Sequence, residues 1–244
     1  TCALPIYVAR YGAFASGEDY LRDTTRQFYA RRFVISYPNE ELPAGRPLKT
    51  SPVHATLAAE GARFGVNWGM ETPQYFVAGD ATSDGGAAAT FVENLTMRRS
   101  NAHRFVADEV RAVREAAGMF DASVYARYEV SGPGAEAWLS RVMTNTMPRT
   151  GRLVLTPMLN HQGRLIGDFT IAKAAEGRFM MWGSSQAQVY HMRWFQGVLP
   201  ADGSVRIDVL GMRMVGLSIA GPRSRERSEE HTSELQSQFR ISYA

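Results

Sequence analysis

The sequence predicts an α+β fold with an antiparallel sheet and packed helices. Strand-like runs over residues 153–159 and 165–173 are joined by a short turn at residues 161–163, which is typical of a hairpin. A third run, residues 178–182, follows the turn Glu176-Gly177. Helical runs occur among these hairpins without a regular strand–helix repeat, and such a mixture indicates an antiparallel sheet with helices on it.

The first hundred residues contain fewer regular elements. Residues 17–32 carry apolar residues among charges and predict an amphipathic helix. The expected elements that follow are a strand over 33–38 ended by proline, a helix over 54–61 closed by glycine, and an aromatic strand over 75–77. Residues 79–89 are rich in Gly, Ala, Ser and Asp and predict an exposed linker. We therefore expect a domain boundary near residues 85–105.

The region after this boundary is more regular. Residues 108–117 predict a helix that ends at Gly118. The remaining expected elements are strands over 124–130, 205–209 and 214–220 and helices over 135–143 and 184–198, in addition to the hairpins named above. The turn at residues 131–134 contains Gly132-Pro133-Gly134, but it lacks a complete phosphate-binding pattern, so turn geometry is the favoured interpretation.

Composition excludes several classes of function. The chain has 244 residues and a net charge of +3, and its basic residues are mostly interspersed with acidic ones and form short pairs but no long run, so a nucleic-acid partner is not expected. No apolar run reaches the roughly 18 residues of a membrane span, and the start lacks a signal-peptide pattern. The single cysteine excludes an internal disulfide framework and is typical of a reducing compartment. We expect a cytoplasmic protein without a membrane partner.

The most informative residue is Asp168, a lone carboxylate inside the strand over residues 165–173. Aspartate is depleted in strands, and burying it without a partner is costly. One interpretation is a carboxylate on the solvent face of an edge strand. The other is a central, covered strand, where a desolvated carboxylate would accept a proton or anchor ring nitrogens. Apolar residues on both faces of the strand favour the second interpretation. From spacing alone, the two interpretations are about equally supported.

The histidines and the chain ends carry less information. His191 is interpreted as a core or surface histidine, and the histidines show no metal-binding spacing. Residues 227–244 resemble the conceptual translation of a sequencing-library adapter, and residues 3–6 resemble the opposite adapter. We expect residues 227–244 to be a non-native tail that is disordered or a chance helix.

From Phe105 onward the chain resembles the folate-binding aminomethyltransferase module of the glycine-cleavage T-protein family. The matching motifs lie at residues 115–123, 130–139, 145, 151–152, 158–168 and 217–224. Residues 37–41, 44–47 and 61–65 are similar to the central connecting domain of dimethylglycine and sarcosine dehydrogenases. The resemblance implies three segments: a small connecting domain over 7–100, an incomplete T-protein-like domain over 101–226, and the tail over 227–244.

The resemblance also implies a function. An upstream FAD domain would oxidise a methylated amine such as dimethylglycine or sarcosine to an iminium, and tetrahydrofolate bound here would capture the one-carbon unit. Asp168 corresponds to the family's catalytic aspartate, and Asn160, Arg152 and Asn145 to the surroundings of the folate pocket. No FAD fingerprint occurs in the chain, so we expect the fragment itself to be inactive.

Three departures from the family pattern leave alternatives open. Many T-proteins have two adjacent acids where this chain has Gly167-Asp168, an aromatic residue is replaced by Leu155, and a family asparagine is replaced near Gly183. One alternative is a stand-alone T-protein relative that binds folate as an aminomethyltransferase, binding or regulatory protein. The other is a structural module that has lost folate binding.

Overall fold

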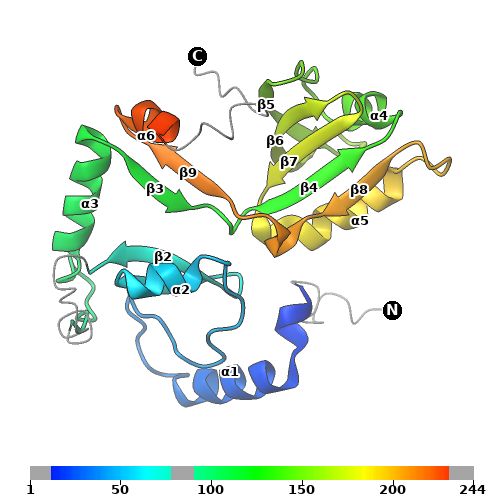
Figure 1. Cartoon of the computed structure of the whole chain (residues 1–244). Coiled ribbons are helices and arrows are strands. Elements are labelled where there is room, and N and C mark those ends of the chain that lie inside the picture. Colours follow the sequence, from blue (N-terminus) through cyan, green and yellow to red (C-terminus); the bar gives the residue numbers. More distant parts are fainter. Residues whose placement is uncertain (1–11, 78–90, 231–244) are drawn as a thin grey trace. The chain divides into compact units, whose positions relative to one another are not determined.

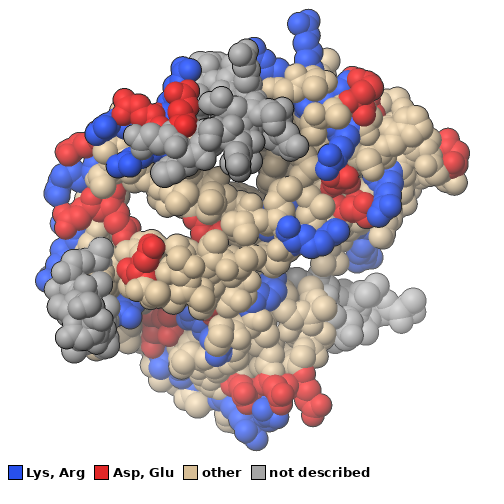
Figure 2. All heavy atoms as spheres, viewed as in Figure 1, with Lys and Arg blue, Asp and Glu red and all other residues tan. Residues whose placement is uncertain are grey.

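The computed structural model describes residues 12–77 and 91–230 (Figure 1). The chain divides into two compact units, and each is treated by itself. Within the described residues, unit 1 comprises 12–77, 91–124 and 215–227, and unit 2 comprises 125–214 and 228–230. No helix of the described residues is long and apolar enough to cross a membrane. Basic and acidic side chains are interspersed over the visible face (Figure 2).

Unit 1 contains two small sheets and several helices. Its elements are η2 (Ala13–Ser16), α1 (Glu18–Ala30), α2 (His54–Ala59), β1 (Ala62–Asn67), β2 (Met70–Phe76), α3 (His103–Glu115), β3 (Gly118–Asp121) and β9 (Leu217–Ala220), followed by the start of α6 (Ser224–Glu230). Strands β1 and β2 form an antiparallel hairpin, and β3 pairs antiparallel with β9. Two-stranded sheets are marginal by themselves, so side-chain contacts must add to their stability.

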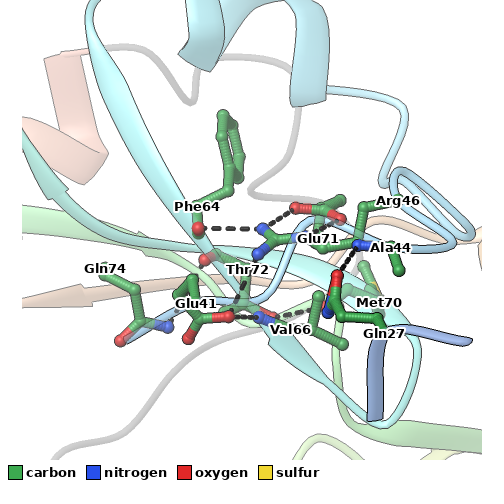
Figure 3. Close-up of polar contacts among 10 residues, drawn as sticks. All are labelled: Gln27, Glu41, Ala44, Arg46, Phe64, Val66, Met70, Glu71, Thr72 and Gln74. Atoms are coloured by element: carbon green, nitrogen blue, oxygen red, sulfur yellow. Dashed lines mark hydrogen bonds and ion pairs between the residues drawn. The ribbon is translucent and has the colours of Figure 1, made fainter. Parts of the chain in front are cut away.

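The β1–β2 hairpin is joined to the preceding loop by a buried ion pair (Figure 3). Arg46 donates from Nε and Nη2 to the two carboxylate oxygens of Glu71, at 2.9 and 2.5 Å. Its Nη2 also donates to the backbone oxygen of Phe64 at 2.9 Å, and its Nη1 lies 3.0 Å from Glu41. The Glu71 side chain is only 5% exposed. The bidentate geometry thus holds a loop against a strand 25 residues further along the chain.

Unit 2 is a five-stranded antiparallel sheet with its two longest helices on one face. The strands, in spatial order, are β5 (Leu153–Leu159), β6 (Leu165–Ala175), β7 (Arg178–Gly183), β4 (Ala126–Ser131) and β8 (Arg206–Val209). Its helices are α4 (Ala135–Val142), η3 (Ser185–Ala187), α5 (Gln188–Val198) and η4 (Gly211–Arg213). Trp138 and Leu139 of α4 and Phe195 of α5 belong to the same buried cluster as Phe169 and Ile171 of β6. Burial of these side chains fixes which face of the sheet the helices cover.

The structure confirms the α+β class and most of the predicted elements. The helices predicted over 17–32, 54–61, 108–117, 135–143 and 184–198 correspond to α1, α2, α3, α4 and η3 with α5, and the predicted hairpin strands correspond to β5, β6 and β7. Strands β1 and β3 were not predicted. Their sequences show no clear alternation of apolar and polar residues.

Two local predictions are wrong. The predicted strand over 33–38 is not a strand, because Val34 donates its backbone N–H to Arg31 and turns the chain directly after α1. The predicted cap Gly118 lies in β3, whereas α3 ends at Glu115. A Cβ at position 118 would lie 2.4 Å from Val113 Cγ2, so this glycine is required by close packing and not by a left-handed cap.

The predicted segment boundaries remain predictions. The linker over 79–89 lies outside the described residues, as do residues 231–244 of the predicted tail. Residues 227–230 of that tail form the end of α6. The compact units divide at residue 124, so the structural division and the boundary expected near residues 85–105 fall at different places.

Candidate functional site

Asp168 lies on the side of an inner strand that faces away from α4 and α5. Strand β6 is paired with β5 on one side and β7 on the other, so the prediction of a central strand is confirmed. Its neighbour Phe169 is fully buried against the helices, and because successive side chains alternate, Asp168 points to the opposite face. Asp168 is exposed there. The prediction of a desolvated carboxylate is therefore wrong for this structure, since α4 and α5 cover only the other face.

The surroundings of Asp168 combine polar and apolar groups. On β5, Pro157 lies opposite Asp168 and Leu155 lies opposite Thr170. On β7, Trp182 lies on the other side of Thr170. Leu155 is 62% exposed. A carboxylate beside exposed apolar side chains and an aromatic ring can accept hydrogen bonds from the edge of a flat ring system whose face contacts the apolar groups.

Asn145 contacts the edge of β5, and Asn160 stabilises the turn that follows it. The side-chain amide of Asn145 donates to the backbone oxygen of Leu155 at 2.8 Å, which attaches the loop after α4 to the outer edge of β5. The side-chain oxygen of Asn160 accepts from the backbone N–H groups of Gln162 and Arg164 at 2.9 and 3.0 Å. Asn160 thus stabilises a local turn of the backbone, whereas Asn145 attaches a loop to β5.

The structure does not bring all four predicted site residues together. Arg152 is exposed immediately before β5, and Asn160 follows its other end. A strand rises about 3.3 Å per residue, which places their Cα atoms about 26 Å apart. Asp168 is paired with Pro157, three residues from Asn160 and five from Arg152. The two ends of β5 therefore belong to different parts of the surface.

A cleft of about 730 Å³ lies at the Asn160 end of unit 2. It is lined by the end of α4, the turn between β5 and β6, and the end of α5: Arg141, Val142, Met143, Thr144, Leu159, Asn160, His161, Trp194, Gly197, Val198 and Leu199. The His161 and Trp194 rings are 5.3 Å apart. Asp168 is not part of this lining. The sequence carries no local signal for this ring pair, because His161 lies 33 residues before Trp194.

The Gly132-Pro133-Gly134 segment is a turn, as predicted. The backbone N–H of Gly132 donates to Gly177 at 2.9 Å and that of Gly134 to Ser204 at 3.0 Å. A phosphate cradle needs free N–H groups, and these two are bonded to the protein. In the described residues, no group of three or more His, Cys, Asp or Glu side chains could hold a metal ion.

His191 is a core histidine, which is one of the two interpretations made from the sequence. It is 1% exposed on α5, and its ring centroid lies 4.8 Å from that of Phe169. Burial lowers the pKa of the His191 imidazole, while its hydrogen bond to Ile166 and the charge of Asp168 act in the opposite direction. The neutral form is therefore favoured in the folded protein.

This burial predicts a loss of stability in mild acid. Because the pKa of His191 is lower in the folded than in the unfolded chain, the unfolded chain binds more protons as the pH falls below about 6.5. The neutral His191 contributes fully to the free energy of unfolding above that pH. This contribution is lost as the pH falls toward the pKa of the folded state, and the free energy then changes by at most about 1.4 kcal/mol per pH unit. Urea unfolding at pH 7.5 and 5.5 checks this. The free energy of unfolding of His191→Leu should depend less on pH than that of the unsubstituted protein. An unchanged pH dependence would contradict the role of the buried His191 in this loss of stability.

The departures from the family pattern have structural consequences. A Cβ at Gly183 would lie 2.7 Å from the Phe169 ring, so the buried ring excludes a larger residue there. A Cβ at Gly167 would lie 2.4 Å from His191 Nε2. Leu155 remains on the same face as Asp168, in the register described above. Two of the three departures are thus tied to aromatic side chains under β6.

Fold and site together define an α+β domain in which an inner strand of an antiparallel sheet carries an exposed aspartate on the face opposite α4 and α5. The family model described as "GCVT N-terminal domain" matches residues 53–242, more than half of the chain, and the chain belongs to this family. The model described as "FAD dependent oxidoreductase central domain" matches residues 4–51. The matched ranges meet at residues 51–53, and the pair confirms the resemblance inferred from the sequence.

Relatives and a solved structure agree with this family. The chain is 28% identical over 218 residues to the mitochondrial pyruvate dehydrogenase phosphatase regulatory subunit of Mus musculus, covering 88% of this chain and 24% of the relative. It is 25% identical over 227 residues to the mitochondrial dimethylglycine dehydrogenase of Mus musculus, covering 92% and 25%. The chain thus spans about a quarter of the length of these relatives. The crystal structure of glycine cleavage system aminomethyltransferase T from Bartonella henselae shares the fold, with a TM-score of 0.59 at 20% identity over 75% of this chain and 43% of that one.

Proposed function

We propose that this chain is the folate-binding part of an FAD-dependent oxidoreductase that demethylates a small methylated amine, with dimethylglycine or sarcosine as the substrate class. Tetrahydrofolate is proposed to bind over the exposed surface around Asp168, on the face of the unit 2 sheet opposite α4 and α5, and to receive the one-carbon unit there. The observation that carries the proposal is the placement of Asp168, an accessible carboxylate on an inner strand of a GCVT-family sheet.

The residues present fit a reduced folate. The pterin ring has several N–H groups, and Asp168 offers two acceptor oxygens beside Leu155 and Trp182 on the same face. Bound folate would supply the nitrogens that take up the one-carbon unit. The role proposed for Asp168 is to orient one ring N–H and to accept its proton as the nitrogen reacts. FAD is proposed to lie elsewhere in the complete protein, and no step is assigned to it here.

A second candidate function is a regulatory module that does not use folate. One relative of similar identity is named as a regulatory subunit, and Gly167 stands where many T-proteins have a second acid. The two candidates differ in one respect. The folate-binding candidate requires reduced folate to bind at Asp168. The regulatory candidate predicts that substitution of Asp168 does not change any folate-dependent activity of the complete protein.

The experiment is one-carbon transfer to tetrahydrofolate, measured on the complete protein. Asp168→Ala is expected to lower the rate of transfer by about 10²- to 10⁴-fold, the usual contribution of a positioned proton acceptor. Amine oxidation should continue at an unchanged rate. Glu176→Gln removes an exposed carboxylate from the turn after the same strand and serves as the matched control. Normal transfer by a folded Asp168→Ala protein would contradict the proposed role.

A further inference from the structure

The strand that carries Asp168 contains a bulge two residues before it. Leu165 of β6 pairs with Leu159 of β5, and Gly167 pairs with Met158. Ile166 is therefore the extra residue between two consecutive positions of the partner strand. A bulge of this kind bends the strand and changes the direction of the side chains that follow, and bulges are frequent beside functional sites.

His191 of α5 contacts this bulge from the helix-covered side of the sheet. Its Nε2 lies 3.4 Å from the backbone oxygen of Ile166. A carbonyl oxygen can only accept, so Nε2 carries the proton in this contact. Nδ1 has no hydrogen-bond partner among the described residues. The bulge carbonyl is thus the polar group that orients the buried imidazole.

Gly167 provides the space for this contact. A Cβ at position 167 would lie 2.4 Å from His191 Nε2 and 2.9 Å from its Cε1, closer than Cβ atoms approach other atoms. The imidazole occupies the volume that a side chain at position 167 would need. The glycine at 167 and the histidine at 191 are therefore sterically matched.

We propose that His191 is a positioning residue that holds the bulge at Ile166 and thereby fixes the direction in which the Asp168 carboxylate leaves the sheet. A strand that slips by one residue moves each side chain to the opposite face. A contact at the bulge opposes such a slip directly before Asp168. The consequence for folate chemistry rests on the proposed function, whereas the link between His191 and Asp168 does not.

The link is tested first by a double-mutant cycle in the full chain. Gly167→Ala alone should lower the folding equilibrium constant about tenfold or more, because the new methyl group meets the imidazole. In the His191→Ala background the same substitution should cost much less, because the space is empty. Equal losses in the two backgrounds would overturn the matching of these two residues.

The second readout is the side-chain carboxyl carbon of Asp168, followed by NMR in the absence of folate. His191→Leu, which cannot donate, should shift this signal, and His191→Gln, which retains an amide donor, should restore it toward its original position. A signal that is identical in all three proteins would overturn the positioning role. If His191→Leu does not fold, His191→Ala, which also cannot donate and is the background of the cycle above, takes its place in this comparison. A shifted signal in a protein that binds no folate would leave this inference standing and remove the proposed function.

Discussion

Glu71→Ala is expected to lower the free energy of unfolding of unit 1 by about 3–5 kcal/mol, because it removes one partner of a buried ion pair. Arg46 would lose both bonds of its bidentate contact, and its guanidinium, whose side chain is 18% exposed, would keep only the contacts to Glu41 and to the backbone of Phe64. The loop that contains Arg46 would then lose its side-chain attachment to β2 and keep the backbone hydrogen bonds of Lys49 to Gly69 and Glu71. Urea unfolding followed by circular dichroism measures the loss.

The matched control is Glu41→Ala, which removes the second carboxylate beside Arg46. The Glu41 side chain is 48% exposed, and exposed ion pairs contribute about 0–1 kcal/mol, so its substitution should cost far less. Equal losses for Glu41→Ala and Glu71→Ala would show that the buried pair is not what holds the hairpin. The pair also joins the segments matched by the two family models, since Arg46 lies in one and Glu71 in the other.

Gly132→Ala is expected to be the most damaging single-methyl substitution in unit 2. Gly132 has a φ of 119°, and a Cβ there would lie 2.3 Å from the backbone oxygen of Ser204. The left-handed conformation costs an alanine about 1–2 kcal/mol, and forced overpacking adds about 1–3 kcal/mol. The neighbouring atom belongs to the backbone, so it cannot be relieved by a side-chain rotation. Thermal unfolding of the variant measures the combined loss.

Gly163→Ala separates these two costs. Gly163 also has a positive φ, 75°, but a Cβ there would meet nothing within 4 Å. Its substitution should cost only the conformational part, about 1 kcal/mol. A loss at Gly132 no larger than that at Gly163 would mean that the close approach to Ser204 does not exist in solution.

The elements that could be predicted are those whose pattern is local. The hairpins β5, β6 and β7 follow from alternating apolar residues and short turns, and the turn at Gly132 follows from its residue types. The predicted strand over 33–38 shows the limit of this reasoning. Its residues favour a strand, but Val34 is bonded back to Arg31, so the chain turns where the pattern predicts extension.

The site was predictable only in part, because burial depends on partners far away in the sequence. Alternation places Asp168 and Phe169 on opposite faces, but it does not say which face the helices cover. The Arg46–Glu71 ion pair and the His191–Gly167 contact each join residues more than 20 positions apart, and a single sequence carries no signal for such pairs.

The central claim is that reduced folate binds at Asp168, on the face of the sheet opposite α4 and α5, and NMR titration with 5-formyltetrahydrofolate tests it most directly. Saturable shifts are predicted for the Asp168 carboxyl carbon, the Thr170 amide and the Leu155 methyl groups, with His161 and Trp194 of the cleft unaffected. The Asp168→Ala chain should lose these shifts, and Glu176→Gln should retain them. Shifts confined to His161 and Trp194, or no shifts at saturating ligand, would contradict the account.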